Sequence, residues 1–188
     1  MKKLNSQKIK AAIILLLPLA VLAVSSFLFY SGYSPEHRTN NGELIEPPIN
    51  IEDIILEGNE GVYSQKWSLV HFLKGPCDES CWASIYKTRQ VNVRLGKDSQ
   101  RVNRYIFLSQ STELSETDLL KLSKEYPKMK LRKVLDIKTS NNIFKEKSNG
   151  MYLLFDPLGN GILIYNSKVS GGDLLEDLKK LLKNSKIG

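Results

Sequence analysis

Cys77 and Cys81 are the residues whose type and spacing in this chain suggest chemistry, and the chain contains no other cysteine. A helix is expected to begin at Glu79. Cys81 lies four residues after Cys77, about one helical turn away, so the two thiols can form a disulfide after modest backbone adjustment. Unsatisfied N–H groups and the positive end of the helix dipole favour a thiolate there. We therefore expect Cys77 to be the exposed nucleophile and Cys81 the more buried resolving partner.

The residues between the cysteines oppose a strongly acidic thiol. Asp78 and Glu79 are carboxylates, and nearby negative charge raises the pKa of a thiol. Two alternatives to redox chemistry remain open. Cys77 and Cys81 form a structural disulfide after export, or as two thiolates they hold Cu(I), a soft ion that selects sulfur ligands.

Histidine chemistry is restricted because the chain has only two histidines, His37 and His71. This number argues against a multi-histidine metal centre, and neither position supports a Ser-His-Asp site. His37 falls in a predicted linker. His71 falls inside an apolar strand six residues before Cys77, and we interpret it as a packed strand residue.

The hydrophobic pattern predicts alternating strands and helices around the cysteine pair. A short apolar run bounded by Gly75-Pro76 indicates a buried strand just before Cys77. The predicted strands cover 67–73, 102–109, 131–134, 151–155 and 161–165, and the predicted helices cover 79–95, 115–126 and a segment after Ser170. The β-α-β-α-(β)-β-β-α order, with right-handed crossovers, predicts an α/β sandwich of the thioredoxin type.

An uncharged run of 20 residues, Ala11 to Tyr30, is long enough to span a bilayer. Four lysines precede this run and none follows it before residue 34, so the positive-inside rule predicts a cytoplasmic tail over residues 1–10. The rest of the chain is then outside the cytoplasm, which is the periplasm if the cell is Gram-negative. The alternative is a signal peptide cleaved after Val21-Leu22-Ala23, although apolar residues continue past that point.

Beyond the predicted anchor over residues 11–30, the segment 31–50 is rich in glycine, proline and asparagine. We expect it to be a linker, made locally extended by Pro47-Pro48. The folded domain is then expected over residues 51–188. Its composition is ordinary for a globular protein, since 41% of the chain is hydrophobic and 25% charged.

The net charge of +7 gives little support for a nucleic-acid partner, because part of it comes from the lysines before the anchor. A second basic stretch surrounds the first predicted helix of the domain. Its members are Lys87, Arg89, Arg94, Lys97, Arg101 and Arg104. We interpret this stretch as a solvated face; the alternatives are contacts with an acidic partner or with anionic lipid headgroups.

With the anchor, the strand before Cys77-x3-Cys81 and the segment Met151–Asn160, the chain resembles the Sco/SenC family of membrane-anchored, thioredoxin-like proteins. The segment Met151–Asn160 looks like that family's apolar strand followed by an Asp-Pro-x-Gly turn. The resemblance implies a thioredoxin-like fold, a place in the inner membrane, and a role in assembling the copper centre of cytochrome oxidase. The implied partner is an oxidase subunit or another assembly factor.

The chain departs from this family at the third copper ligand. In Sco proteins a histidine shortly before the Asp-Pro strand completes the copper site, and the matching place falls near Ser148, where no histidine stands. Glu146 and Met151 are the nearby substitutes. Thioredoxin-like oxidoreductases also usually carry a cis-proline just before this strand, whereas this chain has Gly150 there.

Three hypotheses for function follow from these residues. In the first, the protein is a membrane-tethered thiol–disulfide factor in cytochrome oxidase assembly, with Cys77 and Cys81 as catalytic residues and no required cofactor. In the second, it is a non-catalytic assembly scaffold with a structural disulfide. In the third, Cys77 and Cys81 carry Cu(I).

Overall fold

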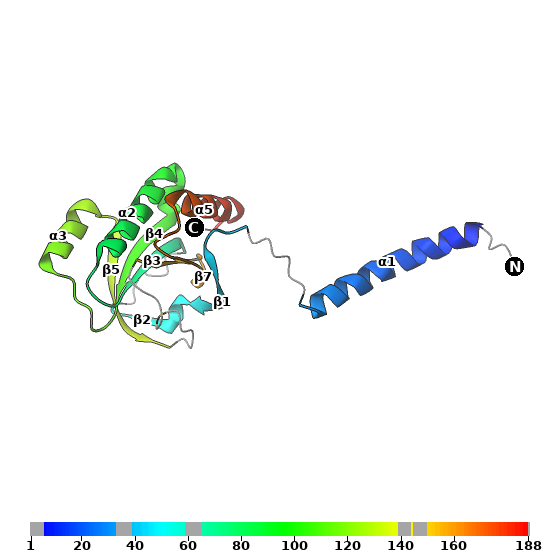
Figure 1. Cartoon of the computed structure of the whole chain (residues 1–188), viewed down its shortest axis with the longest axis horizontal. Coiled ribbons are helices and arrows are strands. Elements are labelled where there is room, and N and C mark those ends of the chain that lie inside the picture. The colour runs from blue at the N-terminus through cyan, green and yellow to red at the C-terminus, as the bar shows by residue number, and fades with distance from the viewer. Residues whose placement is uncertain (1–5, 33–38, 59–64, 139–143, 145–149, 188) are drawn as a thin grey trace. The chain divides into compact units, whose positions relative to one another are not determined.

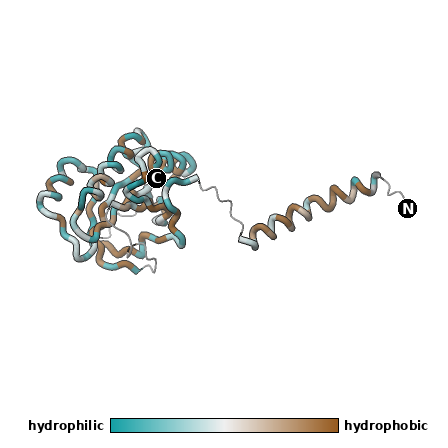
Figure 2. Tube along the Cα trace, viewed as in Figure 1, coloured by the Kyte–Doolittle hydropathy of each residue, from teal (hydrophilic) through white to brown (hydrophobic). Residues whose placement is uncertain are grey.

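The computed structural model describes residues 6–32, 39–58, 65–138, 144 and 150–187. The chain divides into two compact units, Met1–Thr39 and Asn40–Gly188. The first contains the helix α1 (Ser6–Tyr30), within which Ile9–Tyr30 is long and apolar enough to cross a membrane, with a mean hydropathy of 2.7. Most of its residues are coloured as hydrophobic in Figure 2. The prediction of one N-terminal apolar helix is therefore confirmed.

The second unit is built on one sheet of seven strands, in the order β1-β7-β6-β3-β4-β5-β2 (Figure 1). Its strands are β1 (Glu43–Asn50), β2 (Ile54–Leu56), β3 (Trp67–Leu73), β4 (Val102–Leu108), β5 (Met129–Ile137), β6 (Tyr152–Phe155) and β7 (Asn160–Tyr165). Its helices are α2 (Glu79–Arg94), α3 (Glu116–Glu125) and α5 (Gly171–Asn184), with short 3-10 helices η1 (Ile51–Asp53) and η2 (Gly96–Arg101). Strands β3, β4 and β5 are parallel, and β6 and β7 form an antiparallel hairpin beside β3. The predicted α/β sandwich is confirmed.

Both faces of the central strands are buried, which explains their nearly continuous apolar sequences. Alternate residues of β6 show the division, because Tyr152 and Leu154 pack with α5 while Leu153 and Phe155 join a separate cluster on the other face. On the first face α2 and α5 lie against each other (Figure 1). The cysteine pair belongs to a third cluster, between the ends of β3 and β4 and the helices α2 and α3.

The predicted linker over residues 31–50 ends earlier than expected, because Glu43–Asn50 is the edge strand β1 paired with β7. Ile45 and Ile49 of this strand are fully buried. Proline is compatible with a strand only at a sheet edge, and Pro47-Pro48 lies in this edge strand where the register with β7 shifts. The folded domain therefore begins near Asn40 and not at Ile51.

The start of the domain is fastened by a buried carboxylate of α5. Asp177 accepts hydrogen bonds from the backbone N–H groups of Asn41 and Gly42, at 3.0 and 2.9 Å, and from the Tyr165 hydroxyl at 3.1 Å. α5 itself begins with the capping box of Ser170 and Asp173, which closes its first turn.

Candidate functional site

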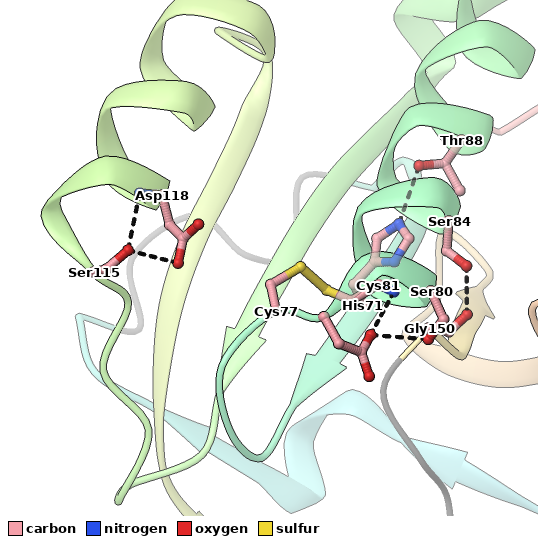
Figure 3. Close-up of a disulfide and its surroundings, with 10 residues drawn as sticks. His71, Cys77, Ser80, Cys81, Ser84, Thr88, Ser115, Asp118 and Gly150 are labelled. Carbon is pink, nitrogen blue, oxygen red and sulfur yellow. Dashed lines mark hydrogen bonds between the residues drawn. A yellow bond between two sulfur atoms is a disulfide. The ribbon is translucent and has the colours of Figure 1, made fainter.

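Cys77 and Cys81 lie at the junction between the end of β3 and the start of α2. They are joined by a disulfide, with their Cα atoms 5.3 Å apart (Figure 3). β3 runs through the centre of the sheet, and Gly75-Pro76 ends its apolar run before α2 begins. The bridge therefore connects the first turn of α2 to the loop that precedes it.

Asp78 determines how α2 begins. Its carboxylate accepts the backbone N–H of Cys81 and the hydroxyl of Ser80, both at 2.9 Å, and its carbonyl accepts the N–H of Trp82 at 3.0 Å. Asp78 is thus the N-cap, and Cys77 is the residue immediately before it. One of the N–H groups at the start of α2, that of Cys81, is therefore already occupied by a carboxylate.

The two sulfur-bearing residues differ in burial in the expected sense. Cys81 is 0% exposed, while Cys77 is half-buried at the edge of the same hydrophobic cluster. Trp82 also packs at the edge of this cluster, with its ring 6.1 Å from that of Tyr126 and the Lys121 ammonium 3.9 Å above it. A reagent in solvent thus approaches the bridge at Cys77.

Gly150 contacts the same turn of α2 from the opposite side. Its carbonyl accepts a 2.6 Å hydrogen bond from the buried Ser84 hydroxyl, and Figure 3 shows this contact beside Cys81. Its φ of +88° suits glycine, and a Cβ there would lie 2.8 Å from Ser80 Oγ and 3.1 Å from the Ser80 carbonyl oxygen. Sequence reasoning noted only that Gly150 stands where a cis-proline is usual, and missed this contact.

His71 is a packed strand residue, as the sequence suggested. It is 1% exposed, its Nε2 lies 3.0 Å from Thr88 Oγ1, and its ring contacts that of Tyr152 at 5.2 Å. Burial, with the positive charge of Arg104 as a second cause, lowers the pKa of His71 to about 3. Its described hydrogen bond joins it to α2 through Thr88.

The described residues do not supply the three-ligand copper set of the Sco family. Within them, no three His, Cys, Asp or Glu side chains gather at a place that suits a metal ion. Met151, one suggested substitute, packs against the cluster on the other face of the sheet from the cysteines. His37, Glu146 and Ser148 lie outside the described residues.

The buried His71 makes the domain sensitive to acid. The unfolded state takes up a proton near pH 6.5 and the folded state only near pH 3, so stability falls as the pH drops below about 6.5. Between pH 7 and pH 5 we expect a loss of about 2 kcal/mol from this residue. His71→Gln is expected to flatten that dependence, as measured by denaturant unfolding of the full chain in detergent at both pH values. Equal dependence in the two proteins would contradict a neutral buried His71.

The fold, together with a bridged cysteine pair between a central strand and its helix, defines a thioredoxin-like protein. The chain belongs to the family described as transmembrane-like, thioredoxin-like, C-terminal domain, whose model matches residues 67–185. No curated protein is significantly similar to the chain in sequence.

The solved structures that resemble this one include Sco proteins, in agreement with the family resemblance predicted from the sequence. Copper-bound ScoI of Arabidopsis thaliana has a TM-score of 0.51 at 14% identity, over 77% of this chain and 99% of that chain. Copper-bound Sco1 of yeast has a TM-score of 0.49 at 14% identity, over 78% of this chain and 90% of that chain. A DsbF homologue from Corynebacterium diphtheriae has a TM-score of 0.44 at 10% identity, over 79% of this chain and 96% of that chain. At these identities the likeness is one of fold.

Proposed function

We propose that the protein is a membrane-tethered thiol–disulfide factor that assists cytochrome oxidase assembly outside the cytoplasm. The observation that carries the proposal is the unequal exposure of a bridged pair, with Cys77 half-buried and Cys81 fully buried at the start of α2. Such a pair suits a nucleophile that meets a target and a partner that resolves the product. The oxidase as the target rests on the fold likeness to Sco proteins.

In the proposed reaction the reduced protein transfers two electrons to an oxidised target, such as the disulfide of copper-ligand cysteines. The Cys77 thiolate attacks one target sulfur, which forms a mixed disulfide and releases the other target sulfur as a thiolate. The Cys81 thiolate then attacks the Cys77 sulfur, which restores the Cys77–Cys81 bridge and releases the second target thiolate. An external dithiol reductant returns the protein to its reduced form.

The size of the loop closed by the bridge supports a reactive role over a stabilising one. The cysteines are four positions apart, and closing so short a loop is worth only about 2 kcal/mol by the chain-entropy estimate. The extended hydrophobic clusters on both faces of the sheet are independent of the bridge. We therefore expect the domain to stay folded when the pair is reduced, as a redox cycle requires.

The membrane location rests on α1 and on the charges before it. Four lysines precede the apolar segment, and the positive-inside rule then directs the thioredoxin-like domain out of the cytoplasm. In a Gram-negative cell this is an inner-membrane protein with a periplasmic domain, where disulfide exchange is possible. An uncleaved α1 keeps the domain close to membrane-embedded oxidase subunits.

Copper binding is a second proposal, favoured by the two sulfur atoms and by the fold shared with copper-bound ScoI. The described residues offer two sulfur donors and no third ligand, so only the reduced pair is suited to Cu(I). Uptake of Cu(I) by the reduced full chain against a competing chelator, lost in Cys77→Ser, would support it. Failure of the reduced protein to compete would exclude it.

The redox proposal is tested by trapping. In cells that produce the full chain with Cys81→Ser, the mixed disulfide at Cys77 cannot be resolved, so we expect covalent adducts on non-reducing gels that disappear with reductant. Cys77→Ser/Cys81→Ser is the matched control and should show none. Adducts that contain an oxidase subunit or assembly factor support the proposed target. If nothing is trapped and the double variant retains full oxidase assembly, the non-catalytic scaffold is the correct hypothesis.

A further inference from the structure

The basic stretch predicted from the sequence is divided by the fold into residues with different roles. Lys87 donates to the carbonyl oxygens of Ser167 and Val169, and Arg101 donates to those of Leu182 and Ser185 at the end of α5. These two side chains fasten α5 and the loop before it to the rest of the domain. The interpretation as a solvated face is wrong for Arg104, which is 4% exposed.

Arg104 is buried because it belongs to a strand and not to the helix surface. It lies in β4 opposite Leu69 of β3, and alternation turns it to the same side of the sheet as Val102 and Ile106, the face covered by helices. Within the described part of the chain, its Nη1 has no hydrogen-bond partner. A buried guanidinium nitrogen without a hydrogen-bond partner is costly in free energy, and an anion is its natural partner.

Two adjoining clefts open onto Arg104. One has a volume of about 360 Å³ and is lined by Arg104 together with Lys66, Lys128 and Lys130. The other, of about 350 Å³, is lined by Arg104, Lys128 and Arg89. No described carboxylate lines either cleft, so several cationic groups line volumes with ample room for a small anion.

The electrostatics of Arg104 agree with this geometry. Burial lowers the pKa of Arg104 to about 10, and the neighbouring Arg89 acts in the same direction. Arg89 in turn lies over the Tyr126 ring, with its guanidinium carbon 5.6 Å from the ring centroid. The exposed Glu125 immediately precedes Tyr126 in the chain, but it lines neither cleft.

These clefts are distant from the disulfide within the domain. Cys81 lies in the first turn of α2, whereas Arg89 and Asn92, which line the clefts, lie two to three turns further along the helix. Arg104 lies near the start of β4, and the cysteines follow the opposite end of the parallel strand β3. A ligand held at Arg104 therefore does not depend on the cysteine chemistry.

We infer that the Arg104 clefts form a binding site for a phosphate-type oxyanion, either free phosphate or the phosphate of a lipid headgroup. The guanidinium fork of Arg104 forms the base of the site, since its planar donors match the spacing of oxyanion oxygens. Arg89 and Lys128 supply further positive charge and donors, which suits the several oxygens of a phosphate group better than a single carboxylate. This site is separate from the proposed thiol–disulfide activity.

The test is titration of the full chain in detergent with inorganic phosphate. Calorimetry measures the binding affinity, and the midpoint of thermal unfolding measures the stabilisation. We expect phosphate to bind and to raise the midpoint, and Arg104→Gln to weaken binding by about tenfold or more. Lys128→Gln, at an exposed residue whose loss should not disturb folding, is expected to weaken it by about threefold. Arg94→Gln is the matched control, because this exposed arginine lines neither cleft and its replacement removes the same charge.

The outcomes separate the site from non-specific attraction. Absence of phosphate binding by the unmodified chain, or equal affinities in Lys128→Gln and Arg94→Gln, would overturn the proposal even if Arg104→Gln failed to fold. Repeating the titration in nanodiscs distinguishes the source of the anion. Weaker phosphate binding in phosphatidylglycerol discs than in phosphatidylcholine discs supports a lipid headgroup as the ligand, and equal binding supports free phosphate.

Discussion

Gly150→Ala is expected to lower the free energy of unfolding of the thioredoxin-like domain by about 2–4 kcal/mol. The φ of +88° at Gly150 is a conformation that alanine adopts only with strain. The added Cβ would also meet Ser80 at 2.8 Å from its Oγ and 3.2 Å from its carbonyl carbon. Relief of that contact requires the first turn of α2, which carries Cys81, to move away from β6.

The measurement is denaturant unfolding of the full chain in detergent, with the oxidised pair intact. Gly75→Ala is the matched control, since Gly75 also lies near the cysteines but its Cβ would have nothing within 4 Å and its φ is not positive. We expect the control to change the free energy of unfolding by less than about 1 kcal/mol. Equal effects of the two substitutions would contradict a specific role for Gly150 in positioning α2.

Asp78→Asn is expected to make the cysteine pair more oxidising, with a reduction potential higher by about 20 mV. Asp78 is adjacent to Cys77 in the chain, and its carboxylate accepts a 2.9 Å hydrogen bond from the N–H of Cys81. Asparagine caps helices about as well as aspartate, so the substitution removes the charge and keeps the helix start. The Cys77 thiolate of the reduced protein then loses a repulsive neighbour, and the reduced state is stabilised.

A glutathione redox series on the full chain measures this shift, and the rate of Cys77 alkylation in the reduced protein should rise in parallel. Glu176→Gln removes the same charge from an exposed residue of α5 and should leave both quantities unchanged. Asp78→Ala should give a similar potential but also cost about 1 kcal/mol of stability through the lost cap. An unchanged or more negative potential in Asp78→Asn would show that the carboxylate does not act on the thiol.

The centre of the fold was predictable from the sequence because its signals are local. The apolar run of β3, the turn residues Gly75-Pro76 and the cap at Asp78 follow one another directly and define the strand-to-helix junction. The hairpin of β6 and β7 is similarly indicated by the turn residue Asp156. Its carboxylate accepts hydrogen bonds from the N–H groups of Leu158 and Asn160.

The edges of the sheet were not predictable in this way. β2 has only three residues, Ile54–Leu56, and β1 contains two adjacent prolines, so neither produces the alternation that identifies a strand. Both are stabilised by neighbours that are distant in the chain, β7 for β1 and β5 for β2. Their existence depends on tertiary pairing that a local pattern does not contain.

The surroundings of the cysteines were predictable only in part. The pair and its strand–helix setting follow from sequence, whereas the contact of Gly150 with Ser80 joins residues 70 positions apart. Arg104 was grouped with basic residues near it in sequence, because a charge count does not record which side of a strand a residue occupies. Its burial follows from the pairing of β4 with β3.

The attachment of Asn41 and Gly42 to Asp177 has a mechanical consequence for a tethered domain. Tension on the chain that leads to this point is borne first by the hydrogen bonds from the Asn41 and Gly42 backbone N–H groups to the buried Asp177 carboxylate and by the end of β1. β3 is separated from β1 by β7 and β6 in the sheet order. A pull that detaches the edge strand therefore breaks the pairing of β1 with β7 first, while β7 and β6 still lie between that edge and the strand that leads to Cys77.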